Sequence, residues 1–550
     1  MTLTKATYSM IEGAPVNVLD YGAVGDGVTD NTSALQAAID AAIASGETLY
    51  FPAGTYLAGK LTLSGSIRMT GAATLKLKSA TNDHLLQNNS GGAINIDVRD
   101  MTFDGDYANQ TAWTSLLNFA ETDYITFSGC NVLNVFGAGL DTNPLNQRAL
   151  IEGCRFEGNR DHSGVLNENP LFLSIRCSVT SDPQLVTVND CMFIGEVPAV
   201  SNAGAGGVIV TTNSGGTNKQ GAKCTITNNT FYNCGQNIAG NAVAAITLYR
   251  AAPYSQVCNN RILTTYEKGI DVQSSYSPII TGNYLENIDT VGIALALREG
   301  VYCENGVIAN NVIDGAGDIG IAVFSGPPLP ASDSNNVVIS DNIVRNVDRF
   351  LLVDDYLGAI SITGNVFVNS SSTGSIGNSC ISVIGAKGAG VTYVEGEVLF
   401  ANNIIETFTS TIYFSEWARP VNITGNIIFD NDTSTALVAI YNEADVNITG
   451  NQFKNCLGFV IAQLCESTVN ISSNAFNNSL TTIRGVQLID LDAATLTVVN
   501  GNTFKDCANN IVNYDDALGR NLCVNNVSDA ARSIRIVAPS AVTQANNLFV

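Results

Sequence analysis

Apolar and polar residues alternate over most of the chain, and one short unit returns many times. In its clearest copies, VNITGN occupies 421–426 and 446–451, and VNISSN occupies 469–474. Each copy is followed two residues later by another apolar side chain, so the unit reads apolar-x-x-Asn-x-apolar. Alternation with a period of two places every second side chain on one face of a strand. The pattern therefore predicts short strands joined at a turn that contains asparagine.

The asparagine of this unit recurs at a regular spacing. Successive copies are separated by no fewer than about 23 residues, with some longer intervals. One structural unit with loop insertions is typical of a solenoid, which grows in one dimension and needs no division into three or four domains. The position is held by Asn229, Asn260, Asn283, Asn311, Asn342, Asn365, Asn403, Asn426, Asn451, Asn474, Asn502 and Asn526, and upstream by Cys130, Cys154 and Cys191.

Coils of this length with no helical segment favour an all-β parallel β-helix with three strands per coil. About fifteen coils are expected between residues 95 and 526. The repeated asparagine is then a buried ladder, in which each side-chain amide bonds to the coils above and below. A leucine-rich repeat is the rival architecture, since it also has a periodic asparagine, but its leucine pattern and its helix are missing here.

A single amphipathic helix is expected near the N-terminus. Leu35, Ile39 and Ile43 form an apolar stripe over residues 32–44, and Asp30 or Thr32 would cap its first turn. Such a helix would cover the open end of the strand stack. The expected organisation is a connector at 1–15, a capping segment with the first coils at 16–94, the parallel β-helix at 95–526 and a C-terminal tail at 527–550.

Composition narrows the classes of partner. The chain has 26 Lys and Arg against 49 Asp and Glu, a net charge of -23, which argues against nucleic acid and against an anionic membrane surface. The sequence contains neither an apolar run long enough to span a membrane nor, at its start, the apolar core of a signal peptide. The 13 cysteines form no CxxC pair and are interpreted as small buried hydrophobes. No cofactor and no metal site are expected.

Residues 16–56 carry a specific motif. VNVLDYGAVGDGVTDNTSALQAAIDAA, followed by LYFPAGTY, resembles the N-terminal part of the pectate-lyase-like superfamily, found in bacteriophage tailspikes and polysaccharide-degrading enzymes. The resemblance implies a right-handed parallel β-helix, a homotrimer, and binding and often cleavage of a bacterial surface polysaccharide. The Asp-Pro-His-Glu signature of the mannuronan epimerases that share this motif is absent, which argues against epimerase activity.

The segment YSMIEGAP at 8–15 resembles the connector that leads into this motif in phage tail proteins. It implies attachment to another phage tail or baseplate protein through the N-terminus. The expected location is then the virion tail, after synthesis in the host cytoplasm, with action outside the cell.

Carboxylates are the remaining candidates for chemistry, because neither His84 nor His162 lies in a nucleophile or metal motif. Glycoside hydrolysis needs an acid and a base or nucleophile about 5–9 Å apart, which side chains on neighbouring coils supply. Aligning the coils on one G-I-x-V strand collects acidic, aromatic and basic residues in one lengthwise stripe. The predicted catalytic residues are Glu299, Asp354 and Asp355, with Asp271 next, and the predicted saccharide-binding residues are Arg298, Tyr356, Glu416, Trp417 and Arg419.

Three functions remain open on these residues. The first is an endo-acting tailspike hydrolase on a host polysaccharide. The second is a receptor-binding adhesin of the same fold that does not cleave. The third is a polysaccharide lyase, for which Lys268 beside Asp271, or Arg298 with Tyr302, would supply the base.

Overall fold

The computed structural model describes most of the chain as short strands with intervening turns. The described residues are 13–112, 114–135, 137–158, 171–178, 184–195, 206–212, 221–238, 241–296, 305–324, 336–356, 358–370, 379–385, 396–406, 412–415, 420–431, 436–442, 445–456, 459–465, 468–477, 489–492, 496–507, 512–514, 520–528, 536–537, 542–545 and 547–549.

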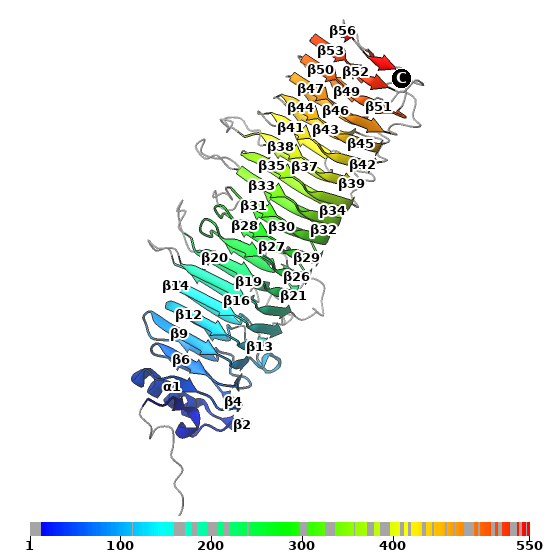
Figure 1. Ribbon diagram of the computed structural model, residues 1–550. Helices are drawn as coiled ribbons and strands as arrows, with labels where there is room; N and C mark the ends of the chain where they lie inside the picture. Colours follow the sequence, from blue (N-terminus) through cyan, green and yellow to red (C-terminus); the bar gives the residue numbers. More distant parts are fainter. Residues whose placement is uncertain are drawn as a thin grey trace, which may run out of the picture. The chain divides into compact units, whose positions relative to one another are not determined.

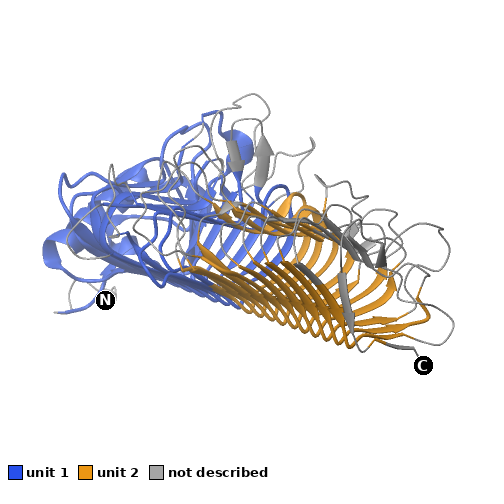
Figure 2. Cartoon of the chain, turned by 90° about the horizontal axis from the view of Figure 1, so that it is seen from above, with its two compact units in different colours: residues 1–279 blue, residues 280–550 orange. Residues whose placement is uncertain are grey.

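The chain forms two compact units, residues 1–279 and residues 280–550 (Figure 2). Within each unit, a strand pairs in parallel with the strand one coil further along; β41 and β44, for example, align Val421 with Val446. Each coil contributes to three sheets. Sheet 2 precedes the turn with the repeated asparagine, sheet 3 follows it, and sheet 1 follows sheet 3 (Figure 1). The predicted parallel β-helix is confirmed.

Unit 1 begins with the short strands β1 (Val16–Asn17), β2 (Asp26–Asp30) and β3 (Leu49–Tyr50). Its sheet 1 contains β5 (Leu61–Leu63), β8 (Leu86–Asn88), β11 (Leu117–Asn118), the first part of β14 (Leu140–Glu152), β16 (Leu171–Cys177), β19 (Gly206–Thr212), β24 (Ile246–Tyr249) and β27 (Ile270–Gln273). Its sheet 2 continues from β3 through β6 (Ile67–Thr70), β9 (Ile94–Arg99), β12 (Thr122–Ser128), the second part of β14, β17 (Leu185–Asn189), β20 (Lys223–Thr227) and β25 (Gln256–Cys258).

Sheet 3 of unit 1 continues from β2 through β4 (Gly54–Ala58), β7 (Ala73–Leu77), β10 (Thr102–Asp104), β13 (Asn131–Val135), β15 (Arg155–Gly158), β18 (Met192–Gly195), β21 (Thr230–Cys234) and β26 (Arg261–Thr265). An antiparallel pair, β22 (Gln236–Ile238) and β23 (Asn241–Val243), stands apart from the three sheets. Two 3-10 turns, η2 (Val18–Tyr21) and η3 (Tyr107–Asn109), lie between strands.

Unit 2 repeats the arrangement, with β28 (Ile279–Thr281) at the boundary. Sheet 1 contains β30 (Val291–Ala296), the second parts of β32 (Val312–Phe324) and β34 (Ile343–Tyr356), β37 (Ile381–Gly385), β40 (Ile412–Ser415), β43 (Ala436–Asn442), β46 (Phe459–Cys465), β49 (Ile489–Asp492), β52 (Val512–Tyr514) and β55 (Ile536–Val537). Sheet 2 contains β31 (Val307–Ala309), β33 (Asn336–Ser340), β35 (Ala359–Thr363), β38 (Val398–Ala401), β41 (Val421–Thr424), β44 (Val446–Thr449), β47 (Thr468–Ser472), β50 (Leu496–Asn500), β53 (Arg520–Val524) and β56 (Val542–Ala545).

Sheet 3 of unit 2 contains β29 (Tyr284–Ile288), the first parts of β32 and β34, β36 (Val366–Ser370), β39 (Ile404–Glu406), β42 (Ile427–Asn431), β45 (Gln452–Cys456), β48 (Ala475–Asn477), β51 (Thr503–Lys505), β54 (Val527–Ser528) and β57 (Leu548–Phe549). Strands β54 to β57 pair in parallel with the preceding coil, so the stack continues beyond residue 526, where a tail was expected.

The helix expected at 32–44 is α1 (Thr32–Ser45), which packs against the first strands (Figure 1). Its buried residues include the expected Leu35 and Ile39. The cap differs from the expectation, because the N-cap is Asn31 and its side chain makes no capping bond. Asp30 nevertheless accepts a hydrogen bond from the Thr32 amide at 3.0 Å, which satisfies a donor of the first turn.

The predicted asparagine ladder is confirmed, and it runs inside the stack. In unit 2, the Asn426 side-chain amide donates to Asn451 Oδ1 and to the Phe400 carbonyl, both at 2.9 Å. The same pattern joins successive asparagines from Asn283 to Asn526 and reaches Asn547. Because these side chains are buried and fully bonded, they have a structural role.

The thiols behave as the sequence predicts for buried hydrophobes. The described cysteines with placed side chains are free and buried. Cys154 and Cys191 occupy the turn column of unit 1, where the Cys154 amide donates to Cys191 Sγ at 3.4 Å. Burial raises the pKa of the Cys234 thiol to about 12, which keeps it protonated and unreactive.

Stacked side chains fill the interior of both units. Phe156, Phe193 and Phe231 form one stack in unit 1, with ring centroids 5.1 and 4.7 Å apart. Alternation does not predict every exposure correctly. Alternation with the inward Ile293 and Leu295 places Ala294 on the outer side of β30, yet it is buried in a cluster with Val291, Ile319 and Ala322.

Candidate functional site

Sheet 1 of unit 1 presents a row of polar side chains on its outward face. Register places Asn118, Asp141, Ser174, Ile209, Thr247 and Asp271 in one column across successive strands. Two residues further along the strands, a second column contains Arg176, Thr211, Tyr249 and Gln273. Parallel pairing in register thus joins hydroxyl, amide, carboxylate and aromatic groups from six coils on one face.

A pocket of about 270 Å³ opens on this face. It is lined by Ala138, Asp141, Leu171, Ser174, Arg176, Ile209 and Thr211. One Arg176 nitrogen, Nη2, bonds to both oxygens of Asp141 at 3.1 and 3.2 Å. Arg176 is two-fifths exposed, so its remaining N–H groups are available to the pocket mouth. Apolar walls with a few polar groups are typical of small-molecule and saccharide sites.

Asp271, one of the predicted catalytic residues, is the most constrained carboxylate of the face. It is only 4% exposed, and its Oδ2 accepts hydrogen bonds from Lys268 Nζ at 3.2 Å and from Gln273 Nε2 at 2.6 Å. Its Oδ1 is buried and has no hydrogen-bond partner among the residues that the structure describes. An unpaired buried acceptor costs about 1–3 kcal/mol or more, so a donor from a ligand would be bound favourably there.

Lys268 joins Asp271 to a second buried carboxylate, Glu267. The Lys268 Nζ lies 3.2 Å from Asp271 Oδ2 and 3.4 Å from Glu267 Oε1, so these two oxygens are no further apart than the sum of the two distances. This bound is compatible with the carboxylate separation of glycosidases. Burial alone would lower the pKa of Lys268, but the charges of Asp271 and Glu267 raise it above its ordinary value. Lys268 is therefore a cation here, which argues against its predicted alternative role as a lyase base.

An aromatic ring lies on the strand next to Asp271. Tyr249 of β24 aligns with Gln273 of β27, and the Arg250 guanidinium lies 5.0 Å from the centroid of its ring. Tyrosine rings stack on the apolar faces of sugars, and carboxylates accept hydrogen bonds from sugar hydroxyls. The face around Asp271 thus combines the two kinds of contact that saccharide recognition uses.

The other predicted residues are placed only in part. Asp354 lies in β34 of unit 2, half-buried, where it aligns with Phe324 of β32. Asp355 and Tyr356 belong to the same strand, but their side chains are not described. The remaining predicted residues, Arg298, Glu299, Glu416, Trp417 and Arg419, lie outside the described residues, as does Tyr302.

Sequence reasoning missed Asp141, Arg176 and Glu267. Asp141 follows GAGL at 137–140, and Arg176 follows the apolar run at 171–175, so the same strand alignment extended upstream would have included them. The extra length of the coils at 157–186 and 194–224 hid that register. Glu267 precedes its strand and carries no periodic signal.

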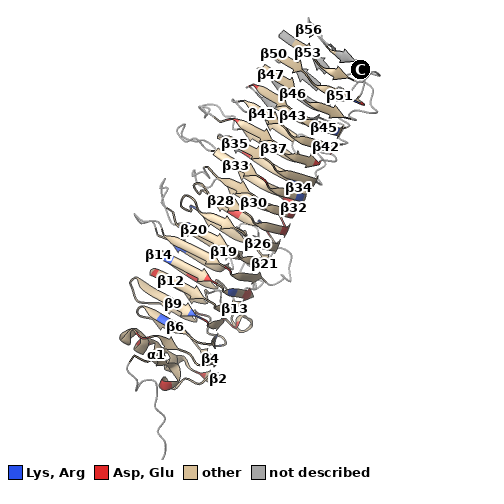
Figure 3. Ribbon diagram, viewed as in Figure 1, with Lys and Arg blue, Asp and Glu red and all other residues tan. Residues whose placement is uncertain are grey.

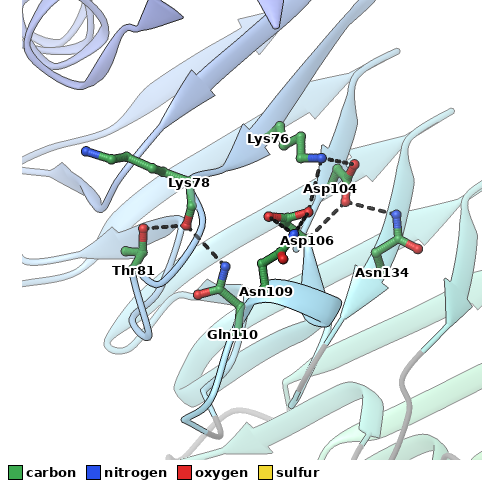
Figure 4. Close-up of polar contacts among 8 residues, drawn as sticks. All are labelled: Lys76, Lys78, Thr81, Asp104, Asp106, Asn109, Gln110 and Asn134. Carbon is green, nitrogen blue, oxygen red and sulfur yellow. Dashed lines mark hydrogen bonds and ion pairs between the residues drawn. The ribbon is translucent and has the colours of Figure 1, made fainter. Parts of the chain in front are cut away.

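A second group of acids has a structural role. Near β7 and β10, Asp104 accepts a hydrogen bond from Asn134 at 2.9 Å, and Asp106 accepts one from Asn109 at 3.0 Å (Figure 4). Lys76 forms ion pairs with Asp106 at 3.1 Å and with Asp104 at 3.9 Å. Gln110 and Thr81 donate hydrogen bonds to the Lys78 carbonyl. The hydrogen bond that Lys76 donates to Asp106 raises the pKa of Lys76, which stays charged. These bonds fix the turn, and the two carboxylates are satisfied within it.

The described part of the chain contains neither a group of possible metal ligands nor a membrane-spanning helix. Its His, Cys, Asp and Glu side chains nowhere gather in a group of three or more that could hold a metal ion. Among the same residues, none of the helices has the length and apolar character needed to cross a membrane.

A family model matches the N-terminal part of the chain. Residues 15–271 match the family described as rhamnogalacturonase A/epimerase, pectate lyase-like. Mannuronan C5-epimerase AlgE1 of Azotobacter vinelandii is 38% identical over 113 residues, which are 18% of this chain and 8% of that protein. Plasmin and fibronectin-binding protein A of Streptococcus pneumoniae is 54% identical over 48 residues, 8% of this chain and 7% of that protein. The matched segments thus span less than a tenth of these two relatives.

A tailspike protein of Escherichia coli bacteriophage HK620 has 13% identity to this chain and a TM-score of 0.35, over 99% of this chain and 81% of its own. A score this low says nothing about function. The match over residues 15–271 and the parallel stacking of the described strands agree with the motif at 16–56. Residues 15–271 of this chain are therefore similar to the pectate-lyase-like family.

Proposed function

We propose that this chain is a phage tailspike that binds a host bacterial surface polysaccharide and hydrolyses it from within. The observation that carries the proposal is Asp271, a buried carboxylate with one oxygen held and one unpaired, on a face lined by Tyr249, Thr247 and Gln273. The oligosaccharide would lie along sheet 1 of unit 1. The pocket at Asp141 and Arg176 would hold a sugar ring about four strand spacings, roughly 19 Å, from Asp271.

In the proposed reaction, Asp271 is the base or nucleophile. Lys268 and Gln273 fix its Oδ2 by hydrogen bonds, which leaves Oδ1 for a water or for the anomeric carbon. Glu267 is the candidate proton donor because it shares Lys268 with Asp271. Glu299, Asp354 and Asp355 of unit 2 remain the alternative catalytic set, with Arg298, Tyr356, Glu416, Trp417 and Arg419 as proposed saccharide-binding residues.

Binding without cleavage is the second candidate function, and Lys268 supports it. The Lys268 ammonium contacts Asp271 Oδ2 and Glu267 Oε1 and holds both carboxylates in place, whereas hydrolysis needs one of the two to give a proton to the leaving group. A receptor-binding adhesin would use the same face and need no proton donor.

Purified capsular, exopolysaccharide and O-antigen chains test these functions. We expect the polymer length to fall without absorbance from unsaturated uronate, as for a hydrolase. A rise in that absorbance would establish a lyase, and intact polymer despite measurable binding would establish an adhesin. Assembly as a homotrimer, attachment through the N-terminus to a tail or baseplate protein, and location in the virion tail are further parts of the proposal.

A further inference from the structure

Sheets 2 and 3 of unit 2 meet at the asparagine turn, and the surface there carries no charge on any of three outward columns. Register over nine coils defines the columns. Together they are called the neutral corner: Val307, Val338, Ser361, Leu399, Asn422, Asn447, Asn470, Val498 and Leu522; Ala309, Ser340, Thr363, Ala401, Thr424, Thr449, Ser472, Asn500 and Val524; and Val312, Ile343, Val366, Ile404, Ile427, Gln452, Ala475, Thr503 and Val527.

The three columns carry fewer charged residues than the composition of the whole chain would give. At the 14% of charged residues in the whole chain, about four of these 27 positions would be charged. The described turn residues between the columns include one acid, Asp341. Charged residues border the corner on both sides: Glu397 and Asp445 before sheet 2, and Arg345, Glu406, Lys454 and Lys505 further along sheet 3. A neutral centre with a charged rim is the usual composition of a protein–protein interface.

The aliphatic side chains of this surface are exposed. Ile343, Ile404 and Ile427 are each 38–39% accessible, and so is Leu399 on the neighbouring column. The surface extends over nine coils of about 4.8 Å and five residues of about 3.3 Å, roughly 700 Å². A standard interface buries about 800 Å² per partner, so the area suffices for a stable contact.

We infer that the neutral corner is the contact surface between copies of this chain. Two copies with a net charge of -23 each repel one another, and they approach most easily where neither carries charge. A polysaccharide is the less suitable occupant, because the 27 positions contain no aromatic ring and no charged donor or acceptor. The inference rests on the homo-oligomer of the proposed function and adds which surface forms it.

The test is the double variant Ile404→Lys/Ile427→Lys of the full chain, compared by sedimentation velocity at micromolar concentration. The matched control is Leu185→Lys/Met192→Lys in unit 1, whose side chains are 46% and 40% exposed. We expect the wild type and the control to sediment as an oligomer, at three times 57.8 kDa for a trimer. The corner variant should sediment as a monomer or associate at least about 100-fold more weakly, because two ammonium groups would be buried unpaired.

Circular dichroism and thermal unfolding verify that the variants are folded. If the double variant fails to fold, Asn447→Arg on the neighbouring column provides the same test. An oligomer that survives these substitutions would overturn the inference, and so would loss of polysaccharide binding at unchanged mass. A monomeric wild type would overturn both the expected trimer and this surface, whereas the cleavage assay judges the proposed hydrolase separately.

Discussion

The two units are packed in the same way inside, but they differ on the surface around the asparagine turn. Both stack phenylalanine rings, at 5.1 and 4.7 Å in unit 1 and at 5.0 and 4.9 Å through Phe453, Phe476 and Phe504 in unit 2. Outside, the columns that are neutral in unit 2 carry Asp97, Arg99, Glu152, Arg155 and Arg261 in unit 1. In Figure 3, β6 and β9 carry charged residues, whereas β33, β35, β41 and β44 are tan. A repeat fold fixes its inward positions and leaves its outward positions free to differ in function.

The turn column itself also differs. Unit 2 has an uninterrupted asparagine ladder, whereas unit 1 places Cys130, Cys154 and Cys191 before Asn229 and Asn260. A thiol fills the space but makes only weak hydrogen bonds, so each cysteine contributes less there than an amide does. Unit 2 therefore has the more strongly bonded turn beneath its neutral corner.

The largest loss of stability should come from removing a stacked ring inside either unit. Phe476→Ala in unit 2 and Phe193→Ala in unit 1 should each lower the free energy of unfolding by about 3–5 kcal/mol, because each removes a ring stacked on both sides. Urea unfolding followed by circular dichroism measures the loss. A difference of more than about 2 kcal/mol between the variants would contradict equal packing of the two units.

Replacing one amide of the ladder should separate the two turn columns. Asn426→Ala removes the acceptor of the Asn403 amides and the side-chain donor to the Phe400 carbonyl and to Asn451 Oδ1, and should cost roughly 3 kcal/mol in the same experiment. Cys154→Ala, the counterpart in unit 1, should cost roughly 1–2 kcal/mol. Equal losses would show that the ladder adds nothing beyond filling space.

The cleavage rates of matched variants should show which unit carries the catalytic residues. Asp271→Asn should reduce the rate of polysaccharide cleavage by about 100-fold or more, because an amide is neither a base nor a nucleophile. Binding of the polymer and thermal stability should change little. The matched variant in unit 2, Asp354→Asn/Asp355→Asn, should retain activity; the reverse outcome would assign the reaction to unit 2.

The smallest expected effect is on the stability of the fold at acidic pH. Hydrogen bonds from Lys78 and Thr32 lower the pKa of Asp30 from 3.8 to about 2. A lowered pKa stabilises the fold above pH 3.8, and the contribution is lost as the pH falls toward 2. Because both partners are about half exposed, it should be below about 1 kcal/mol. Asp30→Asn should remove this part of the acid dependence in thermal unfolding between pH 4 and 2, while Asp40→Asn on the exposed side of α1 should not.

The sequence predicts the inward face of the strands better than the outward face. Periodic Ile, Phe and Asn residues predict the strands, the ladder and the helix α1, because inward positions repeat under the same packing and hydrogen-bond constraints. The stripe alignment includes Asp271, which the pairing of β24 and β27 aligns with Thr247, while Gln273 aligns with Tyr249. It missed Arg176 because irregular insertions interrupt the spacing upstream, and it could not provide Glu267 because a residue outside a strand has no period.

The sequence by itself determined the architecture and the buried role of its asparagines and thiols. Only the tertiary structure decided that Lys268 holds two carboxylates, that Asp141 and Arg176 border a pocket, and that Ala294 is covered. The physical reason is that stacking brings together residues 20–40 positions apart, and pairing register decides which of them meet. The neutral corner is visible only in that register, because its residues are adjacent across coils and scattered along the chain.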